Sequence, residues 1–268
     1  LLLLSGKGLR FVSQGFDTHK SFLLLDGTPI IEHIFNALPR FTHYFVSLAS
    51  DCDASLILLV RQCLTKLGLP FTLLTVKSPN SGQADSCFQA LSEAVKLKPE
   101  YSNLPVYIAP CDSIIHFDPR LTTAAFDKPN SFGLMLSPFN PYARLSPSSY
   151  SHCLSDHLSS ASSFYSPFQI SDIFIKYPHI QDNALYLTGA FWSPCLSFLL
   201  DSFYSLYSDI PLVGGERYLD ALASLFLKNT SIEVIGLKCR SYHSLGTPLE
   251  YETALYWYQA LNAGFFSS

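Results

Sequence analysis

The chain opens with Leu1-Leu2-Leu3-Leu4-Ser5-Gly6-Lys7-Gly8-Leu9-Arg10-Phe11, an apolar run followed at once by two closely spaced glycines and two basic residues. The leucines predict a short buried strand, and the glycines predict a tight loop whose main-chain N–H groups can approach an anion. Arg10 and the later Lys20 add positive charge where the negative charge of a phosphate would gather. We therefore interpret the loop Ser5–Gly8 as phosphate-handling; the alternative is a glycine-rich turn after an edge strand.

This loop differs from two common phosphate-binding patterns. A P-loop requires Gly-Lys-Ser/Thr after spacer residues, which the chain lacks here. A dinucleotide fingerprint requires a third glycine that opens a helix, whereas Gln14-Gly15 lies in a predicted loop. The sequence therefore indicates a phosphate loop of another kind.

Composition limits the class of protein. The chain has 268 residues, of which 48% are hydrophobic and 14% charged, so we expect a folded protein with a large core. Its net charge of −4 argues against a nucleic-acid or anionic-membrane partner. No apolar run reaches the length of a membrane span, and Leu1–Leu4 is too short for a signal-peptide core, so no membrane insertion is expected. Seven scattered cysteines fit no zinc or redox spacing and indicate a reducing, cytoplasmic compartment.

Apolar runs alternate with helical patterns in the first half of the chain. The predicted strands are Leu1–Leu4, Tyr44–Leu48, Phe71–Thr75 and Val106–Ala109, and the predicted helices are Pro29–Leu38, Ser55–Leu67 and Gln83–Leu97. Thr28 is the expected N-cap of the first helix, with Pro29 at its first position. Near-continuous apolar strands alternating with helices predict a parallel sheet covered on both faces.

The second half is less regular. The expected strands are Phe132–Leu136, Ile170–Lys176, Ala184–Phe191 and Ile232–Leu237. The expected helices are Pro194–Tyr207 and Glu216–Leu227. A last helix is expected after Gly246-Thr247-Pro248, with Glu250 in its first turn. The serine-rich stretch Ser146–Ser166 is predicted to be an exposed insertion, whose role as a lid, an interface or neither stays open. No linker demands two domains, so we expect a single domain, residues 1–268.

Ligands of parallel sheets bind beyond the carboxyl ends of the strands. The Gly6–Arg10 loop follows the first predicted strand, and Cys111-Asp112 follows the fourth. We therefore expect both segments at one functional edge. The alternative interpretation of Asp112 is an ordinary turn or N-cap aspartate.

Together these segments resemble a known family, the sugar-1-phosphate nucleotidyltransferases, or nucleotide-sugar pyrophosphorylases. The matching pieces span nearly the whole chain in order: Ser5-Gly6-Lys7-Gly8-Leu9-Arg10-Phe11, Thr18-His19-Lys20, Asp26-Gly27-Thr28-Pro29, Gly82-Gln83-Ala84, Cys111-Asp112, Lys176, Gly189, Glu216 and Gly246-Thr247-Pro248. The stretch Ser137–Tyr142 is similar to that of the capsular-polysaccharide-type branch.

The resemblance implies an α/β/α sandwich with a mainly parallel mixed sheet, the Rossmann-like nucleotidyltransferase (GT-A-like) fold. It divides the domain into a nucleotide-binding half, residues 1–130, and a sugar-binding half, residues 131–268. It further implies a role for each candidate residue: Arg10 and Lys20 are catalytic; Ser5, Gly6, Gly8, Gly82 and Gln83 bind the nucleotide; Lys176, Gly189 and Glu216 bind the sugar phosphate; and Asp112 holds Mg²⁺. Gln83, Lys176 and Glu216 could each also be ordinary polar residues of a helix end, a strand or a first helical turn.

The chain departs from the family at three places. His19-Lys20-Ser21 stands where the family has Pro-Lys-Pro, which predicts a less rigid lysine turn. Ile175 replaces a glutamate before Lys176, and Ser244 replaces an aspartate before Gly-Thr-Pro. Asp220 or Asp85 are candidate substitutes for that second metal ligand.

The resemblance implies that a nucleoside triphosphate and a sugar 1-phosphate are converted, with Mg²⁺, into a nucleotide sugar and pyrophosphate for polysaccharide or glycoconjugate synthesis. Alternatives are cytidylyl transfer to a non-sugar phosphate such as phosphocholine, a non-catalytic regulatory relative that binds nucleotide sugars, and a purely structural domain. The nucleobase, the sugar and the oligomeric state, a homo-oligomer included, stay open.

Overall fold

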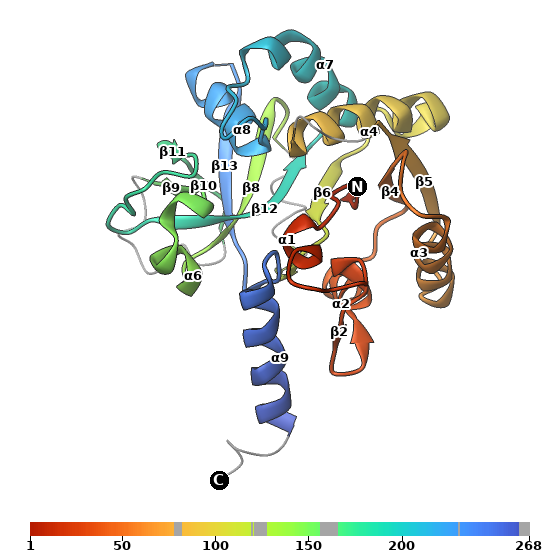
Figure 1. The fold of residues 1–268 in the computed structure, drawn as a ribbon. Coiled ribbons are helices and arrows are strands. Elements are labelled where there is room, and N and C mark those ends of the chain that lie inside the picture. Colours follow the sequence, from red (N-terminus) through yellow and green to blue (C-terminus); the bar gives the residue numbers. More distant parts are fainter. Residues whose placement is uncertain (78–81, 119, 121–127, 156–165, 230, 263–268) are drawn as a thin grey trace.

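A mixed sheet of ten strands forms the middle of the computed structural model, which describes residues 1–77, 82–118, 120, 128–155, 166–229 and 231–262 (Figure 1). The strand order is β10-β13-β8-β12-β6-β1-β4-β5, with β9 against β12 and β11 against β9. These strands are β1 (Leu2–Leu3), β4 (Tyr44–Ala49), β5 (Phe71–Val76), β6 (Val106–Pro110), β8 (Ser131–Ser137), β9 (His152–Leu154), β10 (Phe168–Gln169), β11 (Asp172–Phe174), β12 (Leu185–Ser193) and β13 (Glu233–Lys238).

Parallel pairing joins β6, β1, β4 and β5, and also joins β13 to β8. Strand β12 runs antiparallel to both β6 and β8 and so links the two halves of the chain in one sheet. Two small ribbons lie outside this sheet: β2 (Leu24–Leu25) pairs with β3 (Thr28–Pro29), and β7 (Ser113–His116) pairs with β14 (Ser241–Ser244).

Helices cover both faces of the sheet. The longer ones are α2 (Ile30–Ala37), α3 (Ala54–Lys66), α4 (Gln83–Leu97), α7 (Leu196–Leu206), α8 (Leu219–Lys228) and α9 (Pro248–Asn262). Short turns of helix are α1 (Leu9–Val12), α6 (Pro141–Leu145), η1 (Lys20–Phe22), η2 (Pro99–Tyr101), η3 (Pro147–Ser149) and η5 (Tyr207–Asp209). The predicted α/β/α sandwich with a mainly parallel mixed sheet is confirmed.

The buried strands explain the two-sided core. Successive residues point to opposite faces, so Leu2 and Leu4 join one cluster, with α2 and α3, while Leu3 joins another, with α4, α7 and α8. Strand β6 alternates in the same way: Tyr107 lies in the first cluster and Ile108 in the second. A strand buried on both faces must be apolar at every position, as the sequence of β1 is.

Several predicted boundaries were wrong, and glycine turns account for two of them. Asp26 and Gly27 both have positive φ (50° and 72°) and close the β2–β3 hairpin, so Thr28-Pro29 pairs as a strand and α2 begins at Ile30. Thr28 is therefore not the N-cap. In the same way, Gly214 and Gly215 (φ 61° and 86°) close a turn bridged by Val213 and Glu216, and α8 begins only at Leu219.

Two predictions for the second half of the chain also change. The bounds of the expected strand Ile170–Lys176 were wrong: only Asp172–Phe174 forms a strand there, and as β11 it pairs with β9. The preceding strand β10 lies before the predicted range, at Phe168–Gln169, and pairs with β13. The serine-rich stretch is not simply an exposed insertion: His152–Leu154 forms β9, whose first two residues are buried. Residues 156–165 of that stretch lie outside the described residues.

Two further observations concern the cysteines and the helices. All seven cysteines are free and most of them are buried. Of the helices in the described residues, none combines the length and apolar character that a membrane crossing requires.

Candidate active site

The glycine loop and Asp112 meet at one edge of the sheet. Strands β1 and β6 are parallel neighbours, with Leu3 paired to Pro110, so the segments that follow them leave the sheet side by side. Gly8 has a left-handed backbone (φ 62°), and a Cβ there would lie 3.8 Å from Cγ of Lys20. The loop therefore lies directly against the Lys20 side chain.

Lys20 forms a short ion pair with Asp112. The distance from Nζ to Oδ2 is 2.6 Å, and the side chains retain 13% and 28% of their exposure. Burial opposes the charge of Lys20, but the Asp112 carboxylate outweighs it and raises the lysine pKa. Burial likewise opposes the charge of Asp112, while Lys20 and Arg10 lower its pKa. Both groups therefore stay charged at neutral pH.

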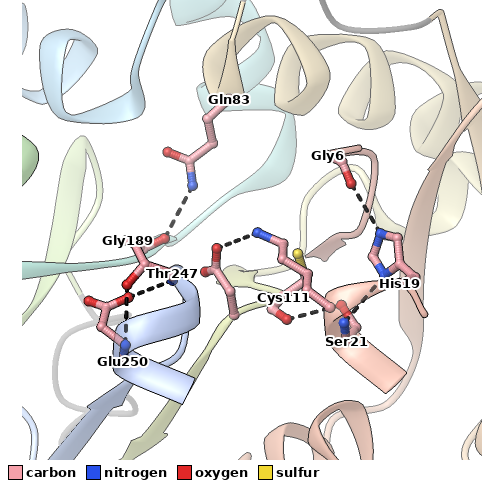
Figure 2. Close-up of polar contacts among 10 residues, drawn as sticks. Gly6, His19, Ser21, Gln83, Cys111, Gly189, Thr247 and Glu250 are labelled. Carbon is pink, nitrogen blue, oxygen red and sulfur yellow. Dashed lines mark hydrogen bonds and ion pairs between the residues drawn. The ribbon is translucent and has the colours of Figure 1, made fainter. Parts of the chain in front are cut away.

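The turn that carries Lys20 is anchored to the chain around it. The hydroxyl of Ser21 donates to the carbonyl oxygen of Cys111 at 3.1 Å, and His19 lies against the Gly6 carbonyl (Figure 2). These are the two residues that replace prolines in the family pattern. The expected loss of rigidity is therefore offset by side-chain hydrogen bonds.

Gly82 allows the start of α4 to approach the turn before α8. Its φ is 102°, and a Cβ at this position would lie 2.5 Å from the carbonyl oxygen of Arg217. The adjacent Gln83 side chain points toward β12, where its Nε2 donates to the Gly189 carbonyl oxygen at 3.5 Å (Figure 2). Gly189 (φ 79°) lies where the pairing of β12 with β8 shifts register.

Lys176 is held by an aromatic ring. It has a positive φ (46°), and its Nζ lies 3.7 Å from the ring centroid of Tyr218. The Tyr218 hydroxyl donates to the carboxylate of Glu216. Burial lowers the pKa of Lys176, against the opposing effect of Asp220 and Glu216. Burial also raises the pKa of Asp220.

The Gly246-Thr247-Pro248 segment closes the other side. The Thr247 N–H donates to Oε2 of Glu250 at 2.8 Å (Figure 2). The hydroxyl of Tyr150 donates to the other carboxylate oxygen of Glu250. A Cβ at Gly246 would lie 3.3 Å from Oδ2 of Asp112. Glycine therefore lets this segment approach the Lys20–Asp112 pair.

These segments enclose two adjoining cavities of about 520 and 470 Å³. We name the first the loop cavity; its lining includes Ser5, Gly6, Gly8, Lys20, Gly82 and Glu216. We name the second the β12 cavity; its lining includes Tyr150, Lys176, Gly189, Asp220, Thr247 and Glu250. Both share Arg10, Gln83, Pro110, Asp112, Tyr218 and Gly246.

All eleven candidate residues therefore line one continuous site. Glu216, expected beside the sugar phosphate, lines the loop cavity instead of the cavity with Lys176 and Gly189. Sequence reasoning missed Tyr218, although it lies two residues after Glu216. It also treated Glu250 only as a helix-dipole residue, whereas its side chain is buried and hydrogen-bonded.

The donor set fits a single Mg²⁺ that is completed by other oxygens. No cluster of three or more His, Cys, Asp or Glu ligands occurs among the described residues, so they form no all-protein metal cage. Mg²⁺ commonly binds through one or two carboxylates, with waters and substrate phosphates. Asp112, at the junction of the cavities, fits that role. Of the suggested second ligands, Asp220 lines the β12 cavity, whereas Asp85 accepts a hydrogen bond from Tyr207 and lines neither cavity.

Comparison with solved structures identifies the fold. A nucleoside-diphosphate-sugar pyrophosphorylase from Vibrio cholerae RC9 aligns over 95% of this chain and 99% of its own, with a TM-score of 0.74 and 19% identity. The chain has the nucleotidyltransferase fold. The inositol-1-phosphate CTP transferase from T. maritima aligns over 96% and 94%, with a TM-score of 0.65 and 18% identity. A UTP-bound UGPase from Acinetobacter baumannii aligns over 97% and 92%, with a TM-score of 0.69 and 13% identity.

Sequence comparison adds nothing to this result. No protein-family model matches the chain, and no curated protein matches it in sequence. At such low identities, the structural likeness establishes the fold, and the chemistry must be argued from the site.

Proposed function

We propose that this protein transfers a nucleotidyl group from a nucleoside triphosphate to a sugar 1-phosphate, releasing pyrophosphate. The observation that carries the proposal is the pair of adjoining cavities. Each contains a half-buried lysine, Lys20 in one and Lys176 in the other, and they share Arg10 and Asp112. Such adjoining cationic sites suit two anionic substrates that react with each other.

The reaction needs alignment and charge neutralisation more than covalent chemistry. An oxygen of the sugar phosphate attacks the α-phosphorus in line, a new P–O bond forms, and the bond to the β-phosphate breaks with pyrophosphate as the leaving group. Arg10 binds the triphosphate above the glycine loop, and Lys20 neutralises charge that develops around the α-phosphate. Mg²⁺ bound by Asp112 would supply further positive charge at the triphosphate.

The remaining residues orient the two substrates. Gln83 offers a donor and an acceptor to the base edge, and Gly82 allows close approach of the base. Lys176 binds the phosphate of the acceptor, Gly189 presents its backbone to the sugar, and Glu216 accepts hydrogen bonds from hydroxyl groups. The serine hydroxyl and N–H groups of the Ser5–Gly8 loop complete the triphosphate site.

We further propose that the chain belongs with the capsular-polysaccharide-type enzymes and that its product feeds polysaccharide or glycoconjugate synthesis in the cytoplasm. The stretch Ser137–Tyr142 supports this assignment. Its Asn140 accepts hydrogen bonds from two backbone N–H groups and caps α6, beside the β12 cavity that Tyr142 lines.

The test is pyrophosphate release with Mg²⁺ across the four ribonucleoside triphosphates and dTTP, each with a panel of sugar 1-phosphates, inositol 1-phosphate and phosphocholine. We expect release with one base and one sugar, and its loss in Asp112→Asn. Nucleotide-sugar binding without release in any combination would instead establish the non-catalytic relative, and no nucleotide binding at all would leave a structural domain.

Cytidylyl transfer to a non-sugar phosphate is the second candidate. It is favoured by the likeness to the structure described as an inositol-1-phosphate CTP transferase. Release with CTP and either non-sugar acceptor, but with no sugar 1-phosphate, would select this reaction.

A further inference from the structure

We propose that His19 is a positioning residue that ties the glycine loop to the Lys20 turn and so keeps the loop in its phosphate-binding conformation. This inference rests on the proposed function, because it assigns the loop a phosphate ligand. His19 itself lines neither the loop cavity nor the β12 cavity; it acts through Gly6 and Lys20.

The His19 ring joins two backbone segments. Its Nδ1 accepts a hydrogen bond from the N–H of Ser21 at 3.3 Å, within the first turn of η1 (Figure 2). Its Nε2 lies 3.0 Å from the carbonyl oxygen of Gly6. Because Nδ1 accepts a backbone N–H, it carries no proton, and the neutral ring must carry its proton on Nε2 and donate it to Gly6. Burial lowers the pKa of His19, which favours this neutral ring.

The loop has few other attachments. Lys7 forms an exposed ion pair with Asp51, and the Gly8 carbonyl accepts from the N–H of Phe11. None of the hydrogen bonds within the described part of the chain is donated by the N–H groups of Gly6, Lys7 or Gly8. Free N–H groups on a glycine loop suit an anion, but such a backbone is also loose unless it is tied. The bond to His19 supplies that tie at Gly6.

The same ring sets the distance between the loop and Lys20. The loop lies along the lysine stem at Gly8, and His19 immediately precedes Lys20. Loss of the bond to Gly6 would therefore let the loop move away from Lys20 without removing any group that touches phosphate. The expected defect is in triphosphate binding and not in acceptor binding.

His19→Asn separates the two bonds of the ring. Asparagine is a good N-cap and can still accept from the Ser21 N–H, but its side chain is too short to reach Gly6. The matched control is His33→Ala. His33 makes the same type of bond, with Nε2 3.0 Å from the Leu25 carbonyl oxygen, but it lines neither cavity.

Two measurements follow on wild type and both variants. The first is binding of inorganic tripolyphosphate with Mg²⁺, and the second is the KM of each substrate. We expect His19→Asn to weaken tripolyphosphate binding and to raise the nucleotide KM, each by about tenfold. This is the effect expected when one hydrogen bond and the preorganisation of the loop are lost. The acceptor KM should stay within about twofold, and His33→Ala should match wild type in all three values. In wild type, ¹⁵N NMR of the imidazole should show the proton of His19 on Nε2.

The outcomes separate the two proposals. Unchanged tripolyphosphate binding in a folded His19→Asn, or a proton on Nδ1, would overturn the positioning role while transfer activity stood. Weakened binding without pyrophosphate release in any substrate combination would uphold the positioning role and overturn the proposed function. A wild-type protein that binds neither tripolyphosphate nor any nucleoside triphosphate would overturn both.

Discussion

Breaking the ion pair between Lys20 and Asp112 should cost more stability than breaking an exposed pair of the same length. At an effective dielectric constant of about 20, two unit charges separated by the observed 2.6 Å attract by about 6 kcal/mol. Desolvation of both groups offsets much of this attraction, and removal of one partner of a buried pair costs about 3–5 kcal/mol. Since Asp112 retains 28% of its side-chain exposure, we expect Asp112→Asn to lower the free energy of unfolding by about 3 kcal/mol.

A double-mutant cycle isolates the pair from other effects of each substitution. We would measure urea unfolding at pH 7 for wild type, Lys20→Met, Asp112→Asn and the double variant, and expect a coupling energy of about 2 kcal/mol. Lys7 and Asp51 provide the matched control, because their charged atoms are also 2.6 Å apart but their side chains are 50% and 47% exposed. That cycle should give less than about 1 kcal/mol. Equal coupling in the two cycles would refute the reasoning from burial.

The same pair predicts a pH dependence. The pKa of Asp112 in the folded protein lies below its ordinary value of 3.8, so its contribution is complete above that value and is lost as the pH falls through the folded pKa. The stability difference between wild type and Asp112→Asn should therefore be largest at neutral pH and shrink under strongly acidic conditions. A difference that stays constant between neutral pH and pH 3 would contradict the assignment.

Three further substitutions test other contacts of the site. Gly82→Ala should lower the free energy of unfolding, measured in urea, by at least about 2 kcal/mol. The new Cβ would lie 2.5 Å from the carbonyl oxygen of Arg217, on a residue whose φ is 102°. An unchanged midpoint of urea unfolding would contradict that contact. Tyr218→Leu removes the ring beneath Lys176 and should raise the acceptor KM about tenfold. Tyr218→Phe keeps the ring and should raise the acceptor KM less. Equal effects of the two substitutions would mean that the hydroxyl of Tyr218 matters instead of its ring. Glu250→Gln should cost about 1–2 kcal/mol of stability by weakening its bonds from Thr247 and Tyr150, while Glu252→Gln on the exposed side of α9 should cost nothing measurable.

Local sequence patterns predicted the central architecture well, because buried parallel strands leave an unusually clear signature. Strand β1 must be apolar on both faces. The glycines that follow it mark a tight loop and not a continuation of the strand. The position of Asp112 followed from the same logic, since chains that leave parallel neighbours emerge at one edge. Where the start of a helix was predicted wrongly, a short turn was responsible: Asp26-Gly27 closes a hairpin that displaces the start of α2.

Contacts between distant segments could not be obtained in this way. Nothing local in the sequence indicates that Tyr218 lies under Lys176, that Tyr150 donates to Glu250, or that His19 reaches Gly6. Each of these pairs depends on how loops from separate strands meet above the sheet, and on left-handed backbone at Lys176 that a strand pattern does not reveal. Residue types and their order therefore indicate which chemistry to expect of the chain, whereas packing of the loops determines which side chains lie together at the candidate site.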